Sequence, residues 1–284
     1  MYKRKEEYKL SECTHNCSTC SSNCSSKKKE DLLFKLHEKS KIKHVIAVAS
    51  GKGGVGKSTV TSLLAVAMAR KGYRVAILDA DITGPSIPKN FGLAGILTAN
   101  EDGMMLPAKT RMGIDVVSAN LMLEDEETPI IWRGPVIAGA VKQFWEEALW
   151  DEVDYMFVDM PPGTGDVPLT VFQSIPIDAA VIVTTPQDLV SMVVSKCVNM
   201  AEKMNVDVIG IVENMSYILC PDCGKKIDVF GHSENPSVAD AHMLATLAKL
   251  PINPALTALA DSGRIEESIT PELEEAANII EKLL

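Results

Sequence analysis

The stretch GKGGVGKST, residues 51–59, decides the fold. It matches the pattern G-x-x-x-x-G-K-[ST], in which backbone N–H groups turn inward around phosphate oxygens. The lysine of this pattern neutralises the β- and γ-phosphates, and the following hydroxyl holds Mg²⁺. An apolar run at 44–50 precedes the loop and a helical pattern at 58–72 follows it, which is the context that a phosphate-binding loop needs. The residues of this loop expected to bind nucleotide are Gly51, Gly53, Gly54, Val55, Gly56, Lys57, Ser58 and Thr59. Lys52, taken by itself, is expected to be an exposed charge on the loop, and its nucleotide role comes only with the resemblance given below.

The composition narrows the class of protein. The 284 residues suffice for one large α/β domain or two small ones, and the net charge of −10 argues against a nucleic-acid partner. No apolar run reaches the roughly 18 residues that a membrane span needs. Residues 1–10 are charged and lack the apolar core of a signal peptide. We expect a cytoplasmic protein that binds neither membrane nor nucleic acid.

The chain divides into two parts at about residue 40. Residues 1–40 are rich in Ser, Cys and Lys, which predicts a short, flexible Cys-rich tail. From 41 to 284, apolar strand patterns alternate with helical ones, which predicts a P-loop ATPase domain of the α/β class. Its mostly parallel, twisted sheet should have helices on both faces. The strand patterns lie at 44–50, 73–81, 114–119, 155–162, 179–187 and 208–216, and the main helical ones at 58–72, 135–150, 189–204 and 270–284.

Acidic residues follow two of the predicted strands. Asp159 comes after four mostly apolar residues, a pattern typical of a carboxylate that binds Mg²⁺ through water, together with Ser58. Asp79 and Asp81 end the second strand, where Asp79 supports either the metal or the loop. Asp166 precedes a helical pattern, so we expect it to cap that helix.

In a cytosolic chain, clustered cysteines are more often metal ligands or redox groups than disulfides. Cys220 and Cys223, in YILCPDCGKK, offer two thiolates, whereas zinc and iron–sulfur sites usually need four ligands. The C-x-x-C spacing alone fits half of a zinc ribbon as well as half of a cluster site. We interpret this stretch as an insertion in the domain at 217–232. Cys197, at helical spacing with Met and Val, is predicted to be a core thiol.

Four more cysteines lie in the tail with the spacing C-x₃-C-x₂-C-x₃-C. Their thiolates could hold a second iron–sulfur cluster or a zinc ion, with His15 as a substitute ligand. The alternative is a disordered thiol-rich tail that helps to hand over clusters. The four candidates are Cys13, Cys17, Cys20 and Cys24.

Several motifs together carry a family resemblance. GKGGVGKS is the deviant Walker form of the MinD/ParA-like ATPases, and LDADITGPSIP (78–88), WRGP (132–135), VDMPPGTGDVPLT (158–170) and ENMS with CPDCG (213–224) follow it in order. In this combination the chain resembles the Mrp/ApbC-type iron–sulfur cluster carrier ATPases from residue 42 to about 270. Related partition and septum-site ATPases lack the cysteine pair. The N-terminal cysteine spacing is narrower than the cluster motif of some eukaryotic relatives.

The resemblance implies a homodimer that sandwiches two ATP molecules and hydrolyses them weakly. Lys52 reaches the partner's nucleotide, Lys57 binds the phosphates, Asp81 orients the attacking water and Asn214 bonds adenine. Two cysteine pairs, one per subunit, would bridge a labile 4Fe–4S cluster. A cluster-assembly scaffold is the implied donor and apo iron–sulfur proteins are the recipients. Zn²⁺ in place of the cluster remains open on spacing alone.

Two other functions share the same nucleotide loop. A partition or positioning ATPase with a structural zinc site is the first, and a membrane version would need a basic amphipathic C-terminal helix. The polar face of residues 270–284 is acidic, which argues against that version. A reductase-type component with a bridging cluster is the second. Such proteins take one cysteine from each of two separate segments rather than a C-x-x-C pair.

Overall fold

The computed structural model describes residues 33–82, 84, 86–122, 134–230 and 238–283. The compact unit among them spans Phe34–Leu284. The tail cysteines Cys13, Cys17, Cys20 and Cys24 fall outside the described residues, so their metal site stays a prediction. His15 and the WRGP residues Trp132 and Arg133 fall outside them as well.

A nine-stranded sheet forms the centre of the domain, in the order β3-β4-β2-β5-β1-β6-β7-β8, with β9 also paired to β7. All pairings except those of β3 and β8 are parallel, which confirms the predicted sheet. The strands in chain order are β1 (Ile42–Ser50), β2 (Val75–Asp79), β3 (Ala108–Lys109), β4 (Asp115–Val117), β5 (Val153–Asp159), β6 (Ala179–Thr184), β7 (Asp207–Leu219), β8 (Lys226–Ile227) and β9 (Thr246–Pro251).

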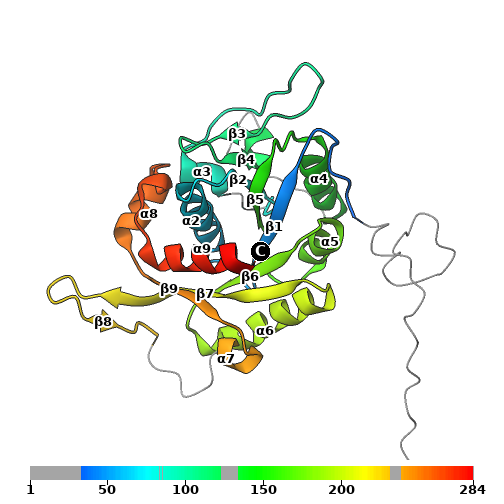
Figure 1. The fold of residues 1–284 in the computed structure, drawn as a ribbon. Helices are drawn as coiled ribbons and strands as arrows, with labels where there is room; N and C mark the ends of the chain where they lie inside the picture. Colours follow the sequence, from blue (N-terminus) through cyan, green and yellow to red (C-terminus); the bar gives the residue numbers. More distant parts are fainter. Residues whose placement is uncertain (1–32, 83, 85, 123–133, 231–237, 284) are drawn as a thin grey trace, which may run out of the picture. The chain divides into compact units, whose positions relative to one another are not determined.

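Helices cover both faces of the sheet, as Figure 1 shows. They are α2 (Lys57–Arg70), α3 (Ile87–Phe91), α4 (Gly134–Glu147), α5 (Asp166–Ser174), α6 (Asp188–Lys203), α7 (Val238–His242), α8 (Pro254–Asp261) and α9 (Pro271–Leu283), with 3-10 turns at Ala119–Met122 and Ile265–Glu267. Within the described ranges no helix combines the length and the apolar character that crossing a membrane requires.

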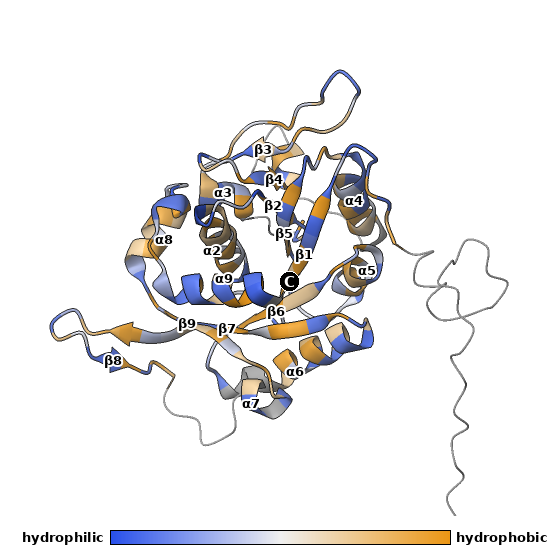
Figure 2. Ribbon diagram, viewed as in Figure 1, coloured by the Kyte–Doolittle hydropathy of each residue, from blue (hydrophilic) through white to orange (hydrophobic). Residues whose placement is uncertain are grey.

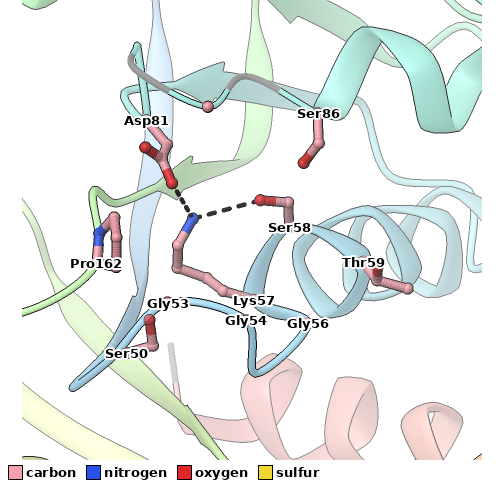
Figure 3. Close-up of a pocket in the computed structure, with 11 residues that line it drawn as sticks. Ser50, Gly53, Gly54, Gly56, Lys57, Ser58, Thr59, Asp81, Ser86 and Pro162 are labelled. Atoms are coloured by element: carbon pink, nitrogen blue, oxygen red, sulfur yellow. Dashed lines mark hydrogen bonds and ion pairs between the residues drawn. The ribbon is translucent and has the colours of Figure 1, made fainter.

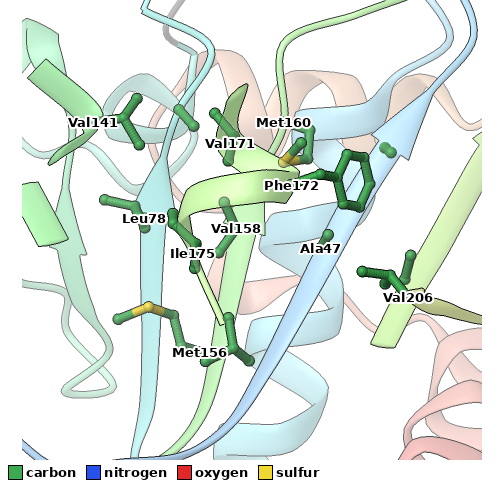
Figure 4. Packing of buried hydrophobic residues seen from close by; sticks show 14 of the residues in the cluster. Ala47, Leu78, Val141, Met156, Val158, Met160, Val171, Phe172, Ile175 and Val206 are labelled. Atoms are coloured by element: carbon green, nitrogen blue, oxygen red, sulfur yellow. The ribbon is translucent and has the colours of Figure 1, made fainter. Parts of the chain in front are cut away.

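Strand alternation divides the core into two clusters, because successive side chains of a strand point to opposite faces. On β1, Ala47 faces a cluster formed with α4, α5 and α6, and Val48 faces a second cluster formed with α2, α3 and α9. Figure 4 shows part of the first cluster, including Met156 and Phe172, and apolar colour follows the same strands in Figure 2. Cys197 is fully buried there, which confirms it as a core thiol.

Residues 34–40, which composition places in the tail, contact the domain. The Phe34 backbone N–H donates to the Ser174 carbonyl at 2.7 Å, and Phe34 and Leu36 pack against the first core cluster. The Ser40 hydroxyl donates to the Ala148 carbonyl. Composition missed this because only two or three apolar residues anchor a segment that is otherwise polar.

Two helix starts show how local sequence sets the fold. α9 begins at Pro271 with Glu272 and Glu274 in its first turn, as the sequence predicts. Asp166 was predicted to cap α5, but Gly165 occupies the cap and Asp166 is the first helical residue, without a capping side-chain bond. Its carboxylate still lies at the positive end of the helix, which favours an acidic residue there as well.

Candidate nucleotide and cysteine sites

The nucleotide loop lies at the carboxyl edge of the parallel sheet. It joins β1 to α2, and the neighbouring strands β5 and β2 end at Asp159 and Asp79. Carboxyl ends of parallel strands meet at one edge, and ligands of open α/β sheets bind there. A cavity of about 220 Å³ opens at this edge (Figure 3). Its lining includes six of the residues predicted from the sequence: Gly53, Gly54, Gly56, Lys57, Ser58 and Thr59, with Asp81 opposite.

The glycines of the loop are required by its geometry. Gly54 and Gly56 have φ angles of 78° and 80°, in the left-handed region that favours glycine. A Cβ atom on Gly51 would lie 2.7 Å from the Val193 carbonyl oxygen of α6. A Cβ on Gly56 would lie 2.3 Å from Asn214 Nδ2. The loop is therefore held on both sides, by the backbone of α6 and by the side chain of Asn214.

Lys57 is the electrostatic centre of the site. Its Nζ lies 2.7 Å from Asp159 Oδ2 and 3.3 Å from Asp81 Oδ2, and its side chain is only 6% exposed. Burial disfavours the charge on Lys57, but the facing carboxylates of Asp159 and Asp81 outweigh burial and raise its pKa. Figure 3 shows the ammonium group between Asp81 and Ser58. The lysine is thus held charged at the point where phosphates would lie.

Asp159 gathers three donors. Besides Lys57, the Ser58 hydroxyl donates to Oδ2 at 2.6 Å and the Thr61 hydroxyl donates to Oδ1 at 2.6 Å. Oxygen atoms of a hydroxyl and a carboxylate at such close range suit Mg²⁺, which binds through one or two carboxylates and keeps several waters. The donor set at Ser58 and Asp159 therefore fits the predicted metal. Thr61 was not predicted, although its position one helical turn after Lys57 places it on the same face of α2.

Asp79, like Asp159, is fully buried. One carboxylate oxygen accepts from the Asp81 backbone N–H at 3.2 Å, and the other accepts from the Ser118 hydroxyl at 2.8 Å. Burial first, and then the neighbouring charge of Asp159, raise the pKa of Asp79 well above its usual value. Asp79 therefore supports the backbone of Asp81, which faces Lys57 directly.

Asn214 closes the other side of the loop. Its Nδ2 donates to the Val55 carbonyl at 2.9 Å and its Oδ1 accepts from the Met215 backbone N–H at 2.9 Å. Met215 has a φ of 56°, unusual for a residue other than glycine, and the pairing of β7 with β9 shifts register between Glu213 and Tyr217. Asn214 thus lies beside the nucleotide loop, and its role towards adenine stays a prediction.

Lys52 lies beside the cavity rather than in its lining. Its Nζ donates to Gln187 Oε1 at 2.8 Å, which joins the nucleotide loop to the segment after β6. Sequence analysis assigned Gln187 no role, although the residue ends the strand pattern at 179–187. The available signal was its position, because Gln187 follows the strand that pairs with β1.

The two cysteines lie on a hairpin that extends from the body of the domain (Figure 1). β7 ends at Leu219, and the Cys220 backbone N–H then donates to the Lys225 carbonyl, while the Gly224 N–H donates to the Cys220 carbonyl. Both cysteines are free thiols, and Cys223 is exposed. Hydrogen bonds from the backbone N–H groups of Cys223 and Asp222 lower the pKa of the Cys220 thiol. This geometry favours the thiolate, which is the form that binds metals.

The cysteine pair does not form a complete metal site within the described part of one chain. Among residues 33–82, 84, 86–122, 134–230 and 238–283, no group of three or more His, Cys, Asp or Glu side chains converges as metal ligands. Two thiolates satisfy half of the four-ligand sets usual for zinc or iron–sulfur clusters.

Comparison with known proteins decides the family. The ParA family model described as NUBPL iron-transfer P-loop NTPase matches residues 41–284. The chain belongs to this family. The resemblance drawn from the motifs is thereby confirmed.

Individual relatives of this P-loop NTPase agree. The chain is 51% identical to an iron–sulfur cluster carrier protein of Clostridium perfringens over 80% of this chain and 82% of that relative. It is 42% identical to an iron–sulfur cluster carrier protein of Methanocaldococcus jannaschii over 89% of this chain and 90% of that relative. A nucleotide-binding protein of Archaeoglobus fulgidus, solved with ADP, is 44% identical over 82% of this chain and 91% of that chain, with a TM-score of 0.73.

The fold extends to more distant ATPases. The cell-division ATPase MinD of Pyrococcus furiosus matches 85% of this chain and 99% of its own, with a TM-score of 0.62 at 20% identity. This likeness confirms the P-loop fold with its mostly parallel sheet, and at that identity it shows the fold alone.

Proposed function

We propose that this P-loop NTPase is an iron–sulfur cluster carrier. Two copies hold a labile 4Fe–4S cluster between their Cys220 and Cys223 thiolates and pass it to apo iron–sulfur proteins. ATP binds at the loop and is hydrolysed slowly. The observation that carries the proposal is the thiol pair itself. Both thiols are free, Cys223 is exposed while Cys220 is half-buried, and the hairpin favours the thiolate of Cys220. The described part of the chain offers the pair no third ligand. The names of the relatives point to the same cargo.

The surroundings of the thiols support a second copy as the source of the missing ligands. Five apolar side chains near the pair are each between 36% and 50% exposed: Ile218, Leu219, Ile227, Val229 and Phe230. Apolar side chains gathered at one tip are typical of a surface that another protein covers. Two such hairpins across a two-fold axis supply four thiolates, and an interface holds a cluster less permanently than a buried core does.

The nucleotide half of the function follows from the charges in the cavity. Lys57 would exchange its bond to Asp159 for the β- and γ-phosphates of a bound nucleotide. The carboxylate of Asp159 and the Ser58 hydroxyl would hold the metal ion. Mg²⁺ supplies neutralisation of phosphate charge. Asp81, which faces the same ammonium group at 3.3 Å, is placed to orient the attacking water. Lys52 adds a positive charge to the nucleotide of the partner subunit, and Asn214 bonds adenine.

The wider assignments belong to this proposal. The protein works in the cytoplasm, receives its cluster from an assembly scaffold and gives it to apoproteins. Because nucleotide and cluster both lie between the same two subunits, the free energy of one binding event changes that of the other. A partition-type ATPase with a structural zinc ion is the competing function, and metal identity separates the two.

Anaerobic reconstitution of the full chain tests the proposal. We expect about four iron and four sulfide per dimer at the hairpin, measured in a variant whose tail cysteines are serine. Cys220→Ser or Cys223→Ser removes this cluster and its transfer to apo-aconitase, whereas the matched Cys197→Ala variant, which loses a buried core thiol, retains both. Zinc in place of iron, or a cluster that survives both hairpin substitutions, contradicts the proposal.

The gating role of ATP needs a separate measurement. A Lys57→Ala variant should bind ATP poorly and should lose the ATP dependence of cluster transfer. Loading and transfer equal to those of the wild type in cells would show that nucleotide does not control the cluster.

A further inference from the structure

We propose that Gln187 is a positioning residue that holds Lys52 within its own subunit until a second copy binds. This inference rests on the dimer proposed above. It starts from one contact: Lys52 Nζ donates to Gln187 Oε1 at 2.8 Å, between residues 135 positions apart in the chain. Lys52 is the residue that must reach the partner's nucleotide, so whatever holds it in the single chain affects dimer formation.

The contact is built into the sheet. β1 and β6 are neighbours, with Ser50 beside Val183, so Lys52 and Gln187 both follow the carboxyl ends of adjacent strands. The Gln187 backbone N–H donates to the Thr185 carbonyl at 2.8 Å, which fixes the turn that presents its side chain. On the other side, the Ser50 hydroxyl donates to the Lys52 carbonyl at 3.0 Å. Both ends of the contact are therefore held by their own strands.

The packing of the loop limits where Lys52 can start. Gly51, the residue before it, lies so close to α6 that a Cβ would meet the Val193 carbonyl oxygen at 2.7 Å. The backbone of the loop is thus fixed against α6, and the freedom left to Lys52 is in its four side-chain torsions. Gln187 selects among those rotamers and keeps the ammonium group out of the lining of its own phosphate cavity.

The chemistry of the acceptor makes the hold reversible. A neutral amide oxygen binds an ammonium group less strongly than a carboxylate or a phosphate does. The phosphates of a partner's nucleotide therefore compete successfully with Gln187 for Lys52. Water alone does not, because replacing this half-buried hydrogen bond with one to water lowers the free energy no further. Gln187 therefore weakens dimers that form without nucleotide. Lys52 leaves Gln187 when both subunits carry nucleotide.

Two substitutions should act in opposite directions. Gln187→Leu keeps the size of the side chain but removes the acceptor, so Lys52 is released. Gln187→Glu keeps the shape and adds a negative charge, so Lys52 is held more tightly. In the full chain with Mg²⁺ and a non-hydrolysable ATP analogue, sedimentation should show a dimer several-fold tighter for Gln187→Leu and several-fold weaker for Gln187→Glu than for the wild type.

A measurement on the single chain tests the contact without the dimer. Acetylation of Lys52 by an N-hydroxysuccinimide ester, followed by peptide mass spectrometry without nucleotide, should be several-fold faster in Gln187→Leu and slower in Gln187→Glu. Lys142, which lies on α4, is the internal control and should react equally in all three proteins. Unchanged Lys52 reactivity in both variants overturns the inference, as does a shift of the dimer constant in the same direction for both.

Failure of the proposed function would look different. If a Lys52→Ala variant dimerises with nucleotide and hydrolyses it as the wild type does, the role of Lys52 across the interface is wrong. The acetylation rates would still decide whether Gln187 holds Lys52 in the single chain.

Discussion

Replacing Gly56 by alanine tests how closely the nucleotide loop is packed against Asn214. The new Cβ would lie 2.3 Å from Asn214 Nδ2, so the amide must retreat by at least about 1.2 Å to reach ordinary van der Waals distance. That retreat breaks the bond from Nδ2 to the Val55 carbonyl, now 2.9 Å long. Gly56 also has a φ of 80°, which alanine adopts only at a cost.

The expected loss of stability is the sum of two effects. The left-handed backbone costs an alanine roughly 1–1.5 kcal/mol. Loss of the Asn214 hydrogen bond costs about 1 kcal/mol more. Gly54 separates these effects, because its φ of 78° is almost the same while nothing lies within 4 Å of its Cβ position. Gly54→Ala should therefore lose about 1 kcal/mol less than Gly56→Ala.

Urea denaturation without nucleotide measures the two variants in the wild-type and Asn214→Ala backgrounds. Once Asn214 is gone, Gly56→Ala has no amide to displace, so its cost should fall to that of Gly54→Ala. Equal costs for the two glycines in the wild-type background would refute the reasoning. An excess for Gly56 that persists without Asn214 would refute it too, because the strain would then lie elsewhere in the loop.

Three further predictions follow from burial and capping. The pKa of Asp79 is raised in the folded state, so the folded state binds this proton more tightly than the unfolded state does. The contribution of Asp79 to the free energy of unfolding therefore falls as the pH rises above about 4. In urea titrations, Asp79→Asn should be more stable than the wild type at pH 7 and equal to it below about pH 4. Burial raises the pKa of Cys197 to about 12, so iodoacetamide at pH 8 should label Cys220 and Cys223 but label Cys197 only in denaturant, as peptide mapping can show. Asn253 accepts from two backbone N–H groups at the start of α8, so Asn253→Ala should cost about 1 kcal/mol in thermal unfolding while Asn253→Asp costs little.

The sequence predicted the parts of the site that depend on strand ends. Runs of apolar residues place Asp79, Asp81 and Asp159 after parallel strands, and the carboxyl ends of such strands meet at one edge. The loop motif then adds Lys57 at the same edge. What the pattern could not give is the pairing: Lys57 binds both Asp159 and Asp81 because all three are buried together, and burial depends on the packed structure.

Other features lie beyond any local pattern. Thr61 binds Asp159, which lies 98 positions further along the chain. Lys52 binds Gln187, which lies 135 positions further along. Gly263 and Gly92 approach so closely that a Cβ on Gly263 would meet the Gly92 Cα at 2.4 Å. Such approaches between distant segments are set by tertiary packing, so the glycines look like ordinary turn residues in the sequence.

The irregular strand β7 determines which face of the hairpin carries the cysteine side chains, relative to the nucleotide loop. Asn214 contacts the loop, the left-handed Met215 interrupts the alternation, and Tyr217 resumes pairing with β9 only three residues before Cys220. Side chains of a strand alternate between faces, so one residue more or fewer between Tyr217 and Cys220 would turn the first thiol to the opposite face. The number of residues between the loop and the cysteines therefore sets the direction in which the thiols point as well as their distance from the loop. In the proposed dimer, two symmetric hairpins can bring four thiols together only if the thiols point to the correct face.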